Sequence, residues 1–391
     1  METLLKWPGG KGREFPQVRA HIPPFQTYVE PFIGGGAFFF NLMPQRSLLN
    51  DVNSKLMGLY ACVRDGDQKF QNTISEYLNA WERLEKAINE LQPPLLELYH
   101  HLRENTASSQ SARMYVGTCL AEYRPTFLQD FNSFSGDPTG LWDAIEFSIQ
   151  SKYARLPKLE RDNAIRFDDA LMRDHIATAV RAGMYTNFRD VFAPRSEVEA
   201  IANFYFLREF CYGSMFRFNK DGKFNIPYGG IGYNSKDFRS KASRLFSPQT
   251  RALFADAQLF NLDFRMFFEV NWALLDEDTF CFLDPPYHTE FSAYDNLAFT
   301  LEDQKALADI FVQLPCQAML IIKDTEFIRG LYHCAQREND NVRIVAFDKT
   351  YSYNVRGRNE RDTQHLLICN YASHPPSRLR GTDRVAVGSR K

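Results

Sequence analysis

The type of fold is indicated most clearly by eight residues, Phe280-Cys281-Phe282-Leu283-Asp284-Pro285-Pro286-Tyr287. Its first four residues are apolar, which predicts a strand buried on both faces, as in a parallel sheet. The second half then falls at the carboxyl end of that strand, where open α/β sheets bind their ligands. The alternative is a strand-ending turn, since Asp and Pro are common in turns for conformational reasons.

The residue types of this turn suit the recognition of an amine. Asp284 supplies an ionised acceptor, and Tyr287 supplies a flat face on which a base could stack. Pro285 and Pro286 have no N–H, so carbonyl oxygens are the main-chain groups presented there. An exocyclic base amine is a poor nucleophile because its lone pair is delocalised into the ring. Two acceptors that bind both of its hydrogens would localise and orient that lone pair.

A nucleotide-binding βα unit is predicted near the N-terminus. Residues 27–32 form a predicted strand, followed by the glycine turn 34–36 and a predicted helix over 37–43. Backbone donors at such a helix start can face an anionic or polar ligand. A second predicted strand, 47–50, ends at Asp51, about 20 residues after Glu30, where an acid would reach ribose hydroxyls. A helix N-cap is the other role open to Asp51.

The chain opens with a glycine turn, Lys6-Trp7-Pro8-Gly9-Gly10-Lys11. Glycine lets the backbone approach a ligand closely, and an indole can stack on one. A purely structural turn would have the same residues.

The C-terminal third predicts five further strands, with helical patterns such as 301–312 between several of them. This alternation indicates a mostly parallel sheet with helices on both faces. The five strands are 258–262 ending at Asp263, 280–283, 318–322, 343–347 and 365–369.

Residues 64–199 have a mostly helical, polar pattern that carries no chemical motif. Pro93 and Pro94 are expected to break the first long helix. Small, polar and turn-forming residues between 106 and 140 predict exposed loops. The favoured interpretation of this region is a helical insertion that packs or recognises something.

A basic hairpin is predicted around the Asp-Gly pair at 221–222, with extended runs over 216–219 and 224–227. A ribbon with a basic tip can enter the major groove of DNA, although a plain surface hairpin would look similar. From Asn203 to Arg251, nine basic residues face three acidic ones and aromatic residues are interleaved, which favours a surface for a polyanion. Residues 351–361 form a polar, basic loop, and the tail 374–391 is expected to be disordered.

Composition indicates a globular protein of 391 residues, with 24% charged residues and a formal net charge of -2. The seven cysteines have no paired spacing typical of zinc or of a disulfide framework, so we expect no metal and a reducing compartment. No segment has the length and apolarity of a membrane span or signal peptide. The expected location is the cytoplasm.

Four blocks, in this order, resemble the Dam-like adenine-N6 DNA methyltransferases of the DPPY type. They are LKWPGGK (5–11), VEPFIGGG (29–36) with LNDVN (49–53), FRFNKDGKFNIPYG (216–229) and DPPY (284–287). The resemblance implies S-adenosylmethionine as cofactor, with the glycine turn beneath its methionine part. The residues expected to bind it are Trp7, Lys11, Glu30, Phe32, Gly34, Gly36, Asp51, Asp263 and Asp284.

The same resemblance implies an α/β fold: a Rossmann-like, seven-stranded methyltransferase sheet with a separate, mostly helical domain and a β-hairpin for DNA recognition. Residues 1–63 and 252–373 would form the catalytic domain and 64–251 the target-recognition domain. The substrate would be a flipped adenine in double-stranded DNA, held by Tyr287 and by its amine on Asp284 and the Pro285 carbonyl. Expected DNA-binding residues are Arg217, Asn219, Lys220, Lys223, Tyr353 and Asn354.

Two details differ from the best-known members of that family. Gly213 and Ser214 replace an Asn-Gly pair, and Gly230 and Ile231 replace an Arg-Tyr pair. Side chains of this ribbon read bases, so the recognised sequence need not be GATC. The enzyme would work alone or beside a cognate restriction endonuclease. The alternatives are a methyltransferase for an RNA base or for a glutamine amine of a protein, and a DNA-binding module without activity.

Overall fold

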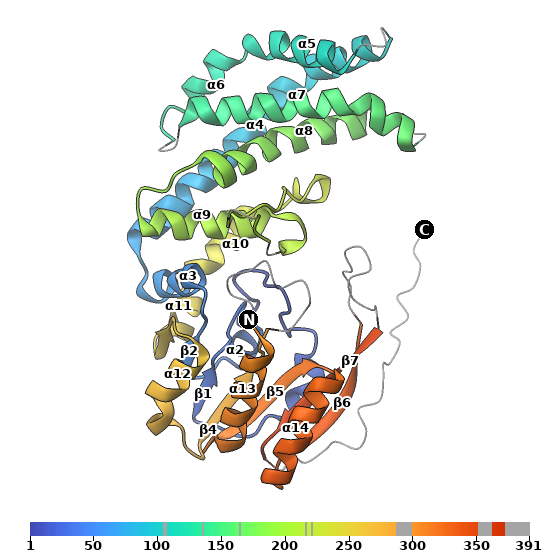
Figure 1. The fold of residues 1–391 in the computed structure, drawn as a ribbon. Helices are drawn as coiled ribbons and strands as arrows, with labels where there is room; N and C mark the ends of the chain where they lie inside the picture. The colour runs from blue at the N-terminus through green and yellow to red at the C-terminus, as the bar shows by residue number, and fades with distance from the viewer. Residues whose placement is uncertain are drawn as a thin grey trace, which may run out of the picture. The chain divides into compact units, whose positions relative to one another are not determined.

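The computed structural model describes residues 1–104, 108–134, 137–163, 166–215, 217–219, 222–286, 299–350 and 362–371. The contacts within the chain divide it into two units (Figure 1). The first unit contains Met1–Thr3, Trp7–Ala61 and Ala252–Lys391. The second contains Leu4–Lys6 and Cys62–Arg251.

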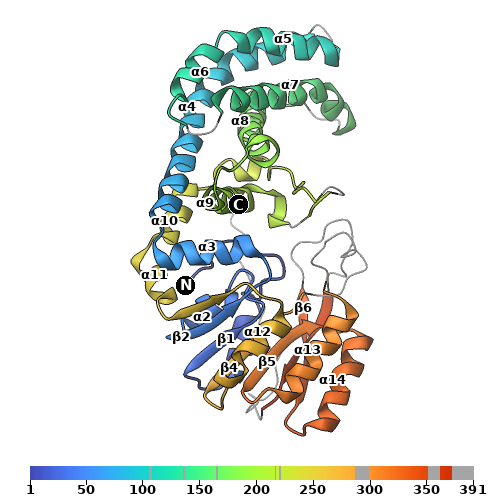
Figure 2. The ribbon, with the colours of Figure 1, turned by 60° about the vertical axis from the view of Figure 1, so that its left-hand side comes forward.

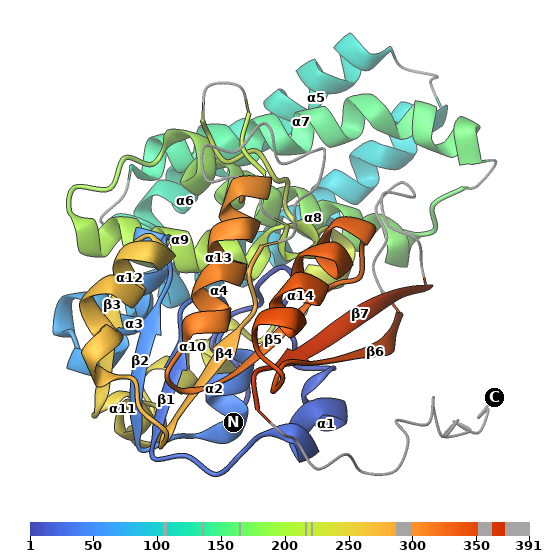
Figure 3. The same ribbon diagram turned by 60° about the horizontal axis from the view of Figure 1, so that its bottom comes forward.

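The first unit is built on a seven-stranded sheet with the order β3-β2-β1-β4-β5-β7-β6, seen from two sides in Figure 2 and Figure 3. β1 to β5 pair in parallel, whereas β7 is antiparallel to both β5 and β6. The predicted Rossmann-like sheet and each of its seven predicted strands are therefore confirmed. The strands are β1 (Thr27–Glu30), β2 (Arg46–Asn50), β3 (Ala257–Phe260), β4 (Thr279–Leu283), β5 (Gln317–Lys323), β6 (Arg343–Thr350) and β7 (Asp362–Cys369).

Helices cover both faces of the sheet, and β4 shows why its residues are apolar throughout. Cys281 and Leu283 belong to a core cluster with residues of α12 (Phe264–Asn271), α13 (Leu301–Gln313) and α14 (Glu326–Glu338). Figure 3 shows α13 and α14 on this face. Phe282 points to the other face and stacks on Phe38 of α2 (Ala37–Leu42), with ring centroids 3.5 Å apart. Successive side chains of a strand alternate between faces, so burial on both requires a continuous apolar run.

The first unit also contains short helices and parts of two helices that it shares with the second unit. The short helices α1 (Phe15–Val18) and η1 (Arg19–His21) precede β1, and η5 (Trp272–Leu274) follows α12. The start of α3 (Ser54–Asp65) and the end of α11 (Pro248–Phe254) belong to this unit, and the remainder of each belongs to the second. Tyr60 packs on Phe254, with ring centroids 5.4 Å apart.

The second unit is mostly helical, as predicted. α7 packs on α5 and α8, and α4 packs on α5, α8 and α9. Trp81 of α4 lies among aromatic residues of α9, 4.0 Å from Phe210 between ring centroids. The elements are α4 (Gln68–Glu104), α5 (Ser109–Ala121), α6 (Arg124–Asp130), α7 (Pro138–Asn163), α8 (Asp169–Thr186), η2 (Asn187–Val191), α9 (Glu197–Phe210), η3 (Tyr212–Ser214), η4 (Ile231–Tyr233) and α10 (Phe238–Leu245).

The predicted break at Pro93 and Pro94 is wrong, because α4 continues through both residues to Glu104. Proline removes a helical hydrogen bond, but apolar residues at helical spacing before and after the pair are buried, including Leu91, Leu95 and Tyr99. Burial of this continuous stripe outweighs the local preference of the two prolines.

The prediction of loops between 106 and 140 is also wrong for much of that stretch, which contains α5 and α6. The side chain of Ser108 accepts the N–H of Ser111 and caps α5. Ala112, Val116 and Leu120 then form a buried stripe with a spacing of four residues. Small and polar residues on the other face of the helix concealed this stripe in the composition.

Among the residues that the structure describes, no helix is long and apolar enough to cross a membrane. Within the same residues, His, Cys, Asp and Glu side chains form no group of three or more that could hold a metal ion.

Candidate active site

The candidate site lies where the strand order of the first unit changes direction. From β1 the chain continues outward to β2 and β3, whereas β4 pairs with the other side of β1 and leads to β5. The carboxyl ends of the adjacent strands β1 and β4 form a topological switch point, the usual ligand position in open α/β sheets. The glycine turn follows β1 and Asp284 follows β4, so both of these predicted groups belong to this edge.

The glycine turn is shaped by close contacts around Gly34. Gly34 has φ 47° and Gly36 has φ 67°, in the left-handed region that favours glycine. A Cβ atom on Gly34 would lie 2.7 Å from Cδ1 of Trp7, so the indole covers this residue directly. The Tyr60 hydroxyl donates to the Gly34 carbonyl at 2.7 Å. Trp7 and Gly34, both predicted cofactor residues, are thus brought into contact.

Asp51 fixes the other side of this turn. Its carboxylate accepts the N–H groups of Gly34 at 3.0 Å and Asn53 at 2.9 Å. Burial raises the pKa of Asp51 to about 6, against the effect of these two hydrogen bonds. The alternative role as a helix cap is wrong, because the Asn53 side chain accepts the Leu56 N–H in the first turn of α3.

Three other predicted cofactor residues have structural contacts. Glu30 is 2% exposed and accepts the Tyr28 hydroxyl at 2.9 Å, and burial raises its pKa well above the ordinary range. Phe32 packs on Phe264 and Phe299. Asp263 follows β3 and caps α12 by accepting the Arg265 N–H at 2.9 Å. The structure therefore places Glu30 in the interior and Asp263 at a helix end.

Asp284 forms an ion pair with Lys11. The Lys11 side chain is 2% exposed and that of Asp284 is 19% exposed, so the cation lies beneath the carboxylate. Lys11 also donates to the Gly9 carbonyl at 3.0 Å. Burial raises the pKa of Asp284, and the Lys11 ammonium acts against this rise. The first glycine turn and the DPPY turn are joined by this pair.

The two prolines that follow differ in exposure: Pro285 is buried and Pro286 is exposed. The side chain of Gln304, on α13, donates to the Pro286 carbonyl at 3.1 Å. Sequence reasoning missed Gln304. Its signal was a polar residue in the buried stripe of α13, which continues through Leu307, Ala308 and Phe311. Tyr287, the last residue of the turn, lies outside the described residues.

The predicted hairpin is an antiparallel pairing in the second unit. Asn219 N–H donates to Lys223 O at 2.8 Å, and Asn225 N–H donates to Arg217 O at 3.1 Å. Gly222 at the turn has φ 71°. The Arg217 side chain donates through Nε to Oδ1 of Asn225 at 2.8 Å, which fixes its direction. Lys220, Tyr353 and Asn354, also predicted to bind DNA, lie outside the described residues.

Several of the nine basic residues between Asn203 and Arg251 are buried or paired within the second unit. Arg208 is 2% exposed. Lys241 pairs with Glu209 at 3.3 Å and Arg239 pairs with Glu82 at 2.7 Å. Arg217 and Lys223 of the hairpin are exposed. Arg251, in α11, is exposed as well, so the exposed charge of this stretch includes the hairpin but is not confined to it.

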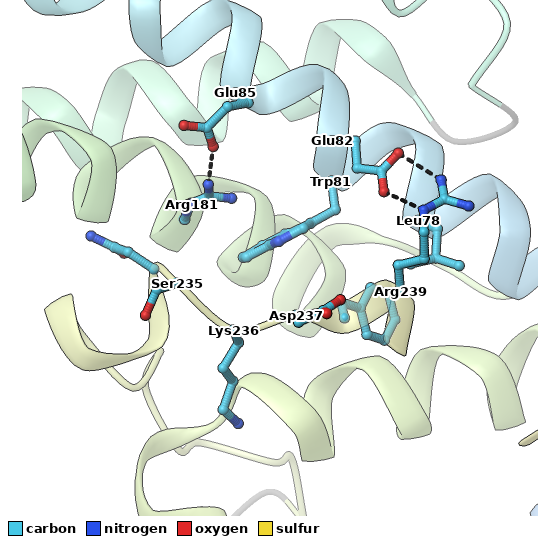
Figure 4. A pocket seen from close by; sticks show the side chains of 11 residues that line it. Leu78, Trp81, Glu82, Glu85, Arg181, Ser235, Lys236, Asp237 and Arg239 are labelled. Atoms are coloured by element: carbon cyan, nitrogen blue, oxygen red, sulfur yellow. Dashed lines mark hydrogen bonds and ion pairs between the residues drawn. The ribbon is translucent and has the colours of Figure 1, made fainter. Parts of the chain in front are cut away.

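A separate pocket of about 280 Å³ lies in the second unit, between α4, α8 and the segment before α10 (Figure 4). The Arg181 guanidinium covers one side of the Trp81 ring, 4.7 Å from its centroid, and pairs with Glu85. Glu82 and Arg239 form a bidentate pair at the rim. The pair between Arg181 and Glu85 connects α8 to α4, and the pair between Arg239 and Glu82 connects α10 to α4.

Together, the strand order and the loops at its switch point define a doubly wound α/β protein with a candidate ligand site at that edge. The family model of the D12 class N6 adenine-specific DNA methyltransferases matches residues 7–128 and 155–362. The chain belongs to this family, which methylates adenine in DNA.

Similar proteins agree with this membership, two of them over nearly their whole length. The type II methyltransferase M.CviBI of Paramecium bursaria Chlorella virus NC1A is 23% identical over 95% of this chain and 100% of its own. The DNA adenine methylase of Vibrio cholerae is 23% identical over 95% of this chain and 97% of its own. The retron Ec67 DNA adenine methylase of Escherichia coli is 32% identical over 39% of this chain and 53% of its own.

Proposed function

We propose that the chain is a site-specific DNA adenine methyltransferase that uses S-adenosylmethionine and acts on an adenine flipped out of duplex DNA. The observation that carries this proposal is the joining of the two turns at the switch point, through the ion pair between Lys11 and Asp284. One turn has the residues of a cofactor site and the other has the acceptors for an amine.

The residues of the first turn fit the cofactor. The contact of Trp7 with Gly34 leaves no room for a side chain at 34, as expected where backbone lines a ligand site. Asp51 has a carboxylate at the end of β2 that could accept ribose hydroxyls. S-adenosylmethionine, when bound, supplies an electrophilic methyl group on its sulfonium. Trp7, Gly34 and Asp51 would hold and orient it.

Asp284 would act on the adenine amine together with the Pro285 carbonyl. Lys11 favours the ionised carboxylate, which is the form that accepts a hydrogen bond from the amine. Gln304 would keep the loop in place through the Pro286 carbonyl. Extrusion of the adenine costs a few kcal/mol, and Tyr287 would stack on the extruded ring.

The two units would divide the work. We assign cofactor binding and methyl transfer to the first unit and target recognition to the second, with Arg217, Asn219, Lys220 and Lys223 of the hairpin on DNA. Tyr353 and Asn354 would contribute from the first. Among the relatives, some are named type II methyltransferases and others DNA adenine methylases, which supports either a cognate restriction endonuclease or independent action.

A side-by-side assay tests the substrate. Purified protein is incubated with methyl-labelled S-adenosylmethionine and with duplex DNA, RNA or protein extract. We expect label in DNA, recovered as N6-methyladenine, and none after Asp284→Ala. Label in RNA or in glutamine of protein would replace the DNA assignment by the alternative substrates, and full activity of the variant would contradict the proposed site.

A further inference from the structure

Arg208, near the end of α9, is a buried arginine whose guanidinium donates to main-chain carbonyls of two separate segments. It is 2% exposed, although arginine is rarely buried unless its donors are paired. Nη1 donates to the Met215 carbonyl at 2.8 Å and Nη2 donates to the Lys6 carbonyl at 2.9 Å. The guanidinium therefore joins two main-chain segments, one of them 202 residues away in the sequence.

Both acceptors lie at the start of a functional segment. Lys6 immediately precedes Trp7, and it belongs to the segment Leu4–Lys6, which is part of the second unit. Leu4 and Leu5 are 2% and 1% exposed, so this segment is firmly packed there. Met215 follows η3 and leads into the hairpin. Arg208 thus holds both the chain that enters the cofactor turn and the chain that enters the DNA-binding ribbon.

The geometry of the guanidinium links the two positions. Its donors lie in one rigid plane, so both carbonyl oxygens must keep a fixed separation to remain bonded. A buried carbonyl that loses its donor is costly, and bonds from a charged donor are stronger than neutral ones. A shift of the Lys6 carbonyl is therefore opposed unless Met215 shifts too.

We propose that Arg208 is a positioning residue that couples cofactor binding to DNA binding. The inference rests on the proposed function, in which the turn after Lys6 binds S-adenosylmethionine and the ribbon after Met215 binds DNA. Coupling between two ligands is reciprocal: DNA tightens the cofactor by the same factor by which the cofactor tightens DNA.

Arg181 provides the matched control. It is another arginine of the second unit, 6% exposed, but its ion pair is with Glu85 of α4. Replacing it removes a buried guanidinium without touching either functional segment. An effect that comes only from the loss of a buried arginine should appear in the Arg181 variant as well as in the Arg208 variant.

The experiment measures the Kd of S-adenosylhomocysteine by calorimetry, with and without a saturating duplex that contains the recognised site. The ratio of the two Kd values is the coupling factor, for which about 5- to 150-fold is typical. We expect a factor in this range for the wild type and for Arg181→Met. In Arg208→Met the coupling factor should fall to about twofold or less. The Kd of S-adenosylhomocysteine without DNA should change less than about threefold.

Arg208→Lys covers the case in which Arg208→Met fails to fold. Its ammonium is a point donor without the guanidinium fork, so the coupling factor should again be lost while the unfolding transition is retained. A wild-type coupling factor in a folded Arg208 variant would overturn the inference, as would a wild type that binds both ligands independently. A wild type that binds neither ligand would instead overturn the proposed function, and the inference with it.

Discussion

Asp51 and Asp284 both follow strands at the switch point, but their neighbours differ. Asp51 accepts two backbone N–H groups, whereas Asp284 is paired with the Lys11 ammonium. Burial raises the pKa of both carboxyl groups, and only Asp284 has a cation to oppose that effect. The ionised form of the residue that we assign to the amine is therefore favoured by a neighbouring charge, and that of the residue assigned to ribose by hydrogen bonds.

Gly34→Ala should weaken both folding and cofactor binding. A left-handed backbone costs a non-glycine residue about 1–2 kcal/mol, and the added methyl would collide with the Trp7 indole. We expect a loss of unfolding free energy of at least that size in urea, and no detectable binding of S-adenosylhomocysteine. Gly12→Ala is the control, since a Cβ there meets no atom within 4 Å. Equal behaviour of the two variants would contradict this account of the turn.

Cofactor affinity should depend on pH through Asp51. Its folded pKa of about 6 is above the ordinary 3.8, so ionisation opposes folding, and the stability it contributes falls as the pH rises from 3.8 to 6. A ribose hydroxyl donates its hydrogen bond best to the ionised carboxylate of Asp51. Cofactor affinity should therefore increase as the pH rises, whereas the stability contributed by Asp51 decreases. We expect the Kd of S-adenosylhomocysteine to rise about tenfold from pH 7 to pH 5, as for one proton. If the Kd of Asp51→Asn depends on pH as strongly as that of the wild type, the proton belongs to another group.

Among the elements, strands could be predicted more reliably than helix ends. The central strands β4 and β5 have uninterrupted apolar runs, over 280–283 and 318–322, because these residues are buried on both faces of the sheet, so the pattern is visible in the sequence alone. Pro93 and Pro94 gave a strong local signal that was wrong, because the buried stripe on either side of them keeps α4 continuous. Helix continuity there depends on packing against α8, which the local sequence does not encode.

Replacement of Pro93 and Pro94 by alanine should stabilise the protein. Alanine restores two helical N–H donors, and proline in a helix interior costs up to about 3 kcal/mol. The greater freedom of the unfolded chain offsets about 0.4–1 kcal/mol of this gain at each site. We expect an increase of about 1 kcal/mol or more in unfolding free energy by urea titration. A lower stability would mean that the local distortion at the prolines is itself needed for packing.

The hairpin should contribute charge to DNA binding. Arg217 and Lys223 are exposed, and each contact with a phosphate adds about 1 to the slope of log K against log salt. Alanine at either position should weaken DNA binding and reduce that slope by about 1. Lys86→Ala is the control, since Lys86 is exposed but pairs with Asp130 at 2.7 Å. An unchanged slope in both hairpin variants would place the DNA elsewhere.

At the scale of the whole molecule, the sequence predicted the sheet and the turns that meet at its switch point. It did not predict the contacts that connect them. The bond from Gln304 to Pro286 and those from Arg208 to Lys6 and Met215 join residues far apart in the chain. Such pairs have no spacing signature, because their geometry exists only after the sheet and the helices have packed.

We propose that the turn containing Asp284, at the switch point of the first unit, binds the adenine that the protein methylates in DNA. Sequencing of DNA from cells that express the protein, with a method that detects N6-methyladenine, tests it most directly. We expect methyladenine at one recurring sequence for the wild type, and none for Asp284→Ala produced at the same level. Methyladenine in DNA from cells with the variant would contradict this role of Asp284. So would DNA without methyladenine from cells that contain folded wild-type protein.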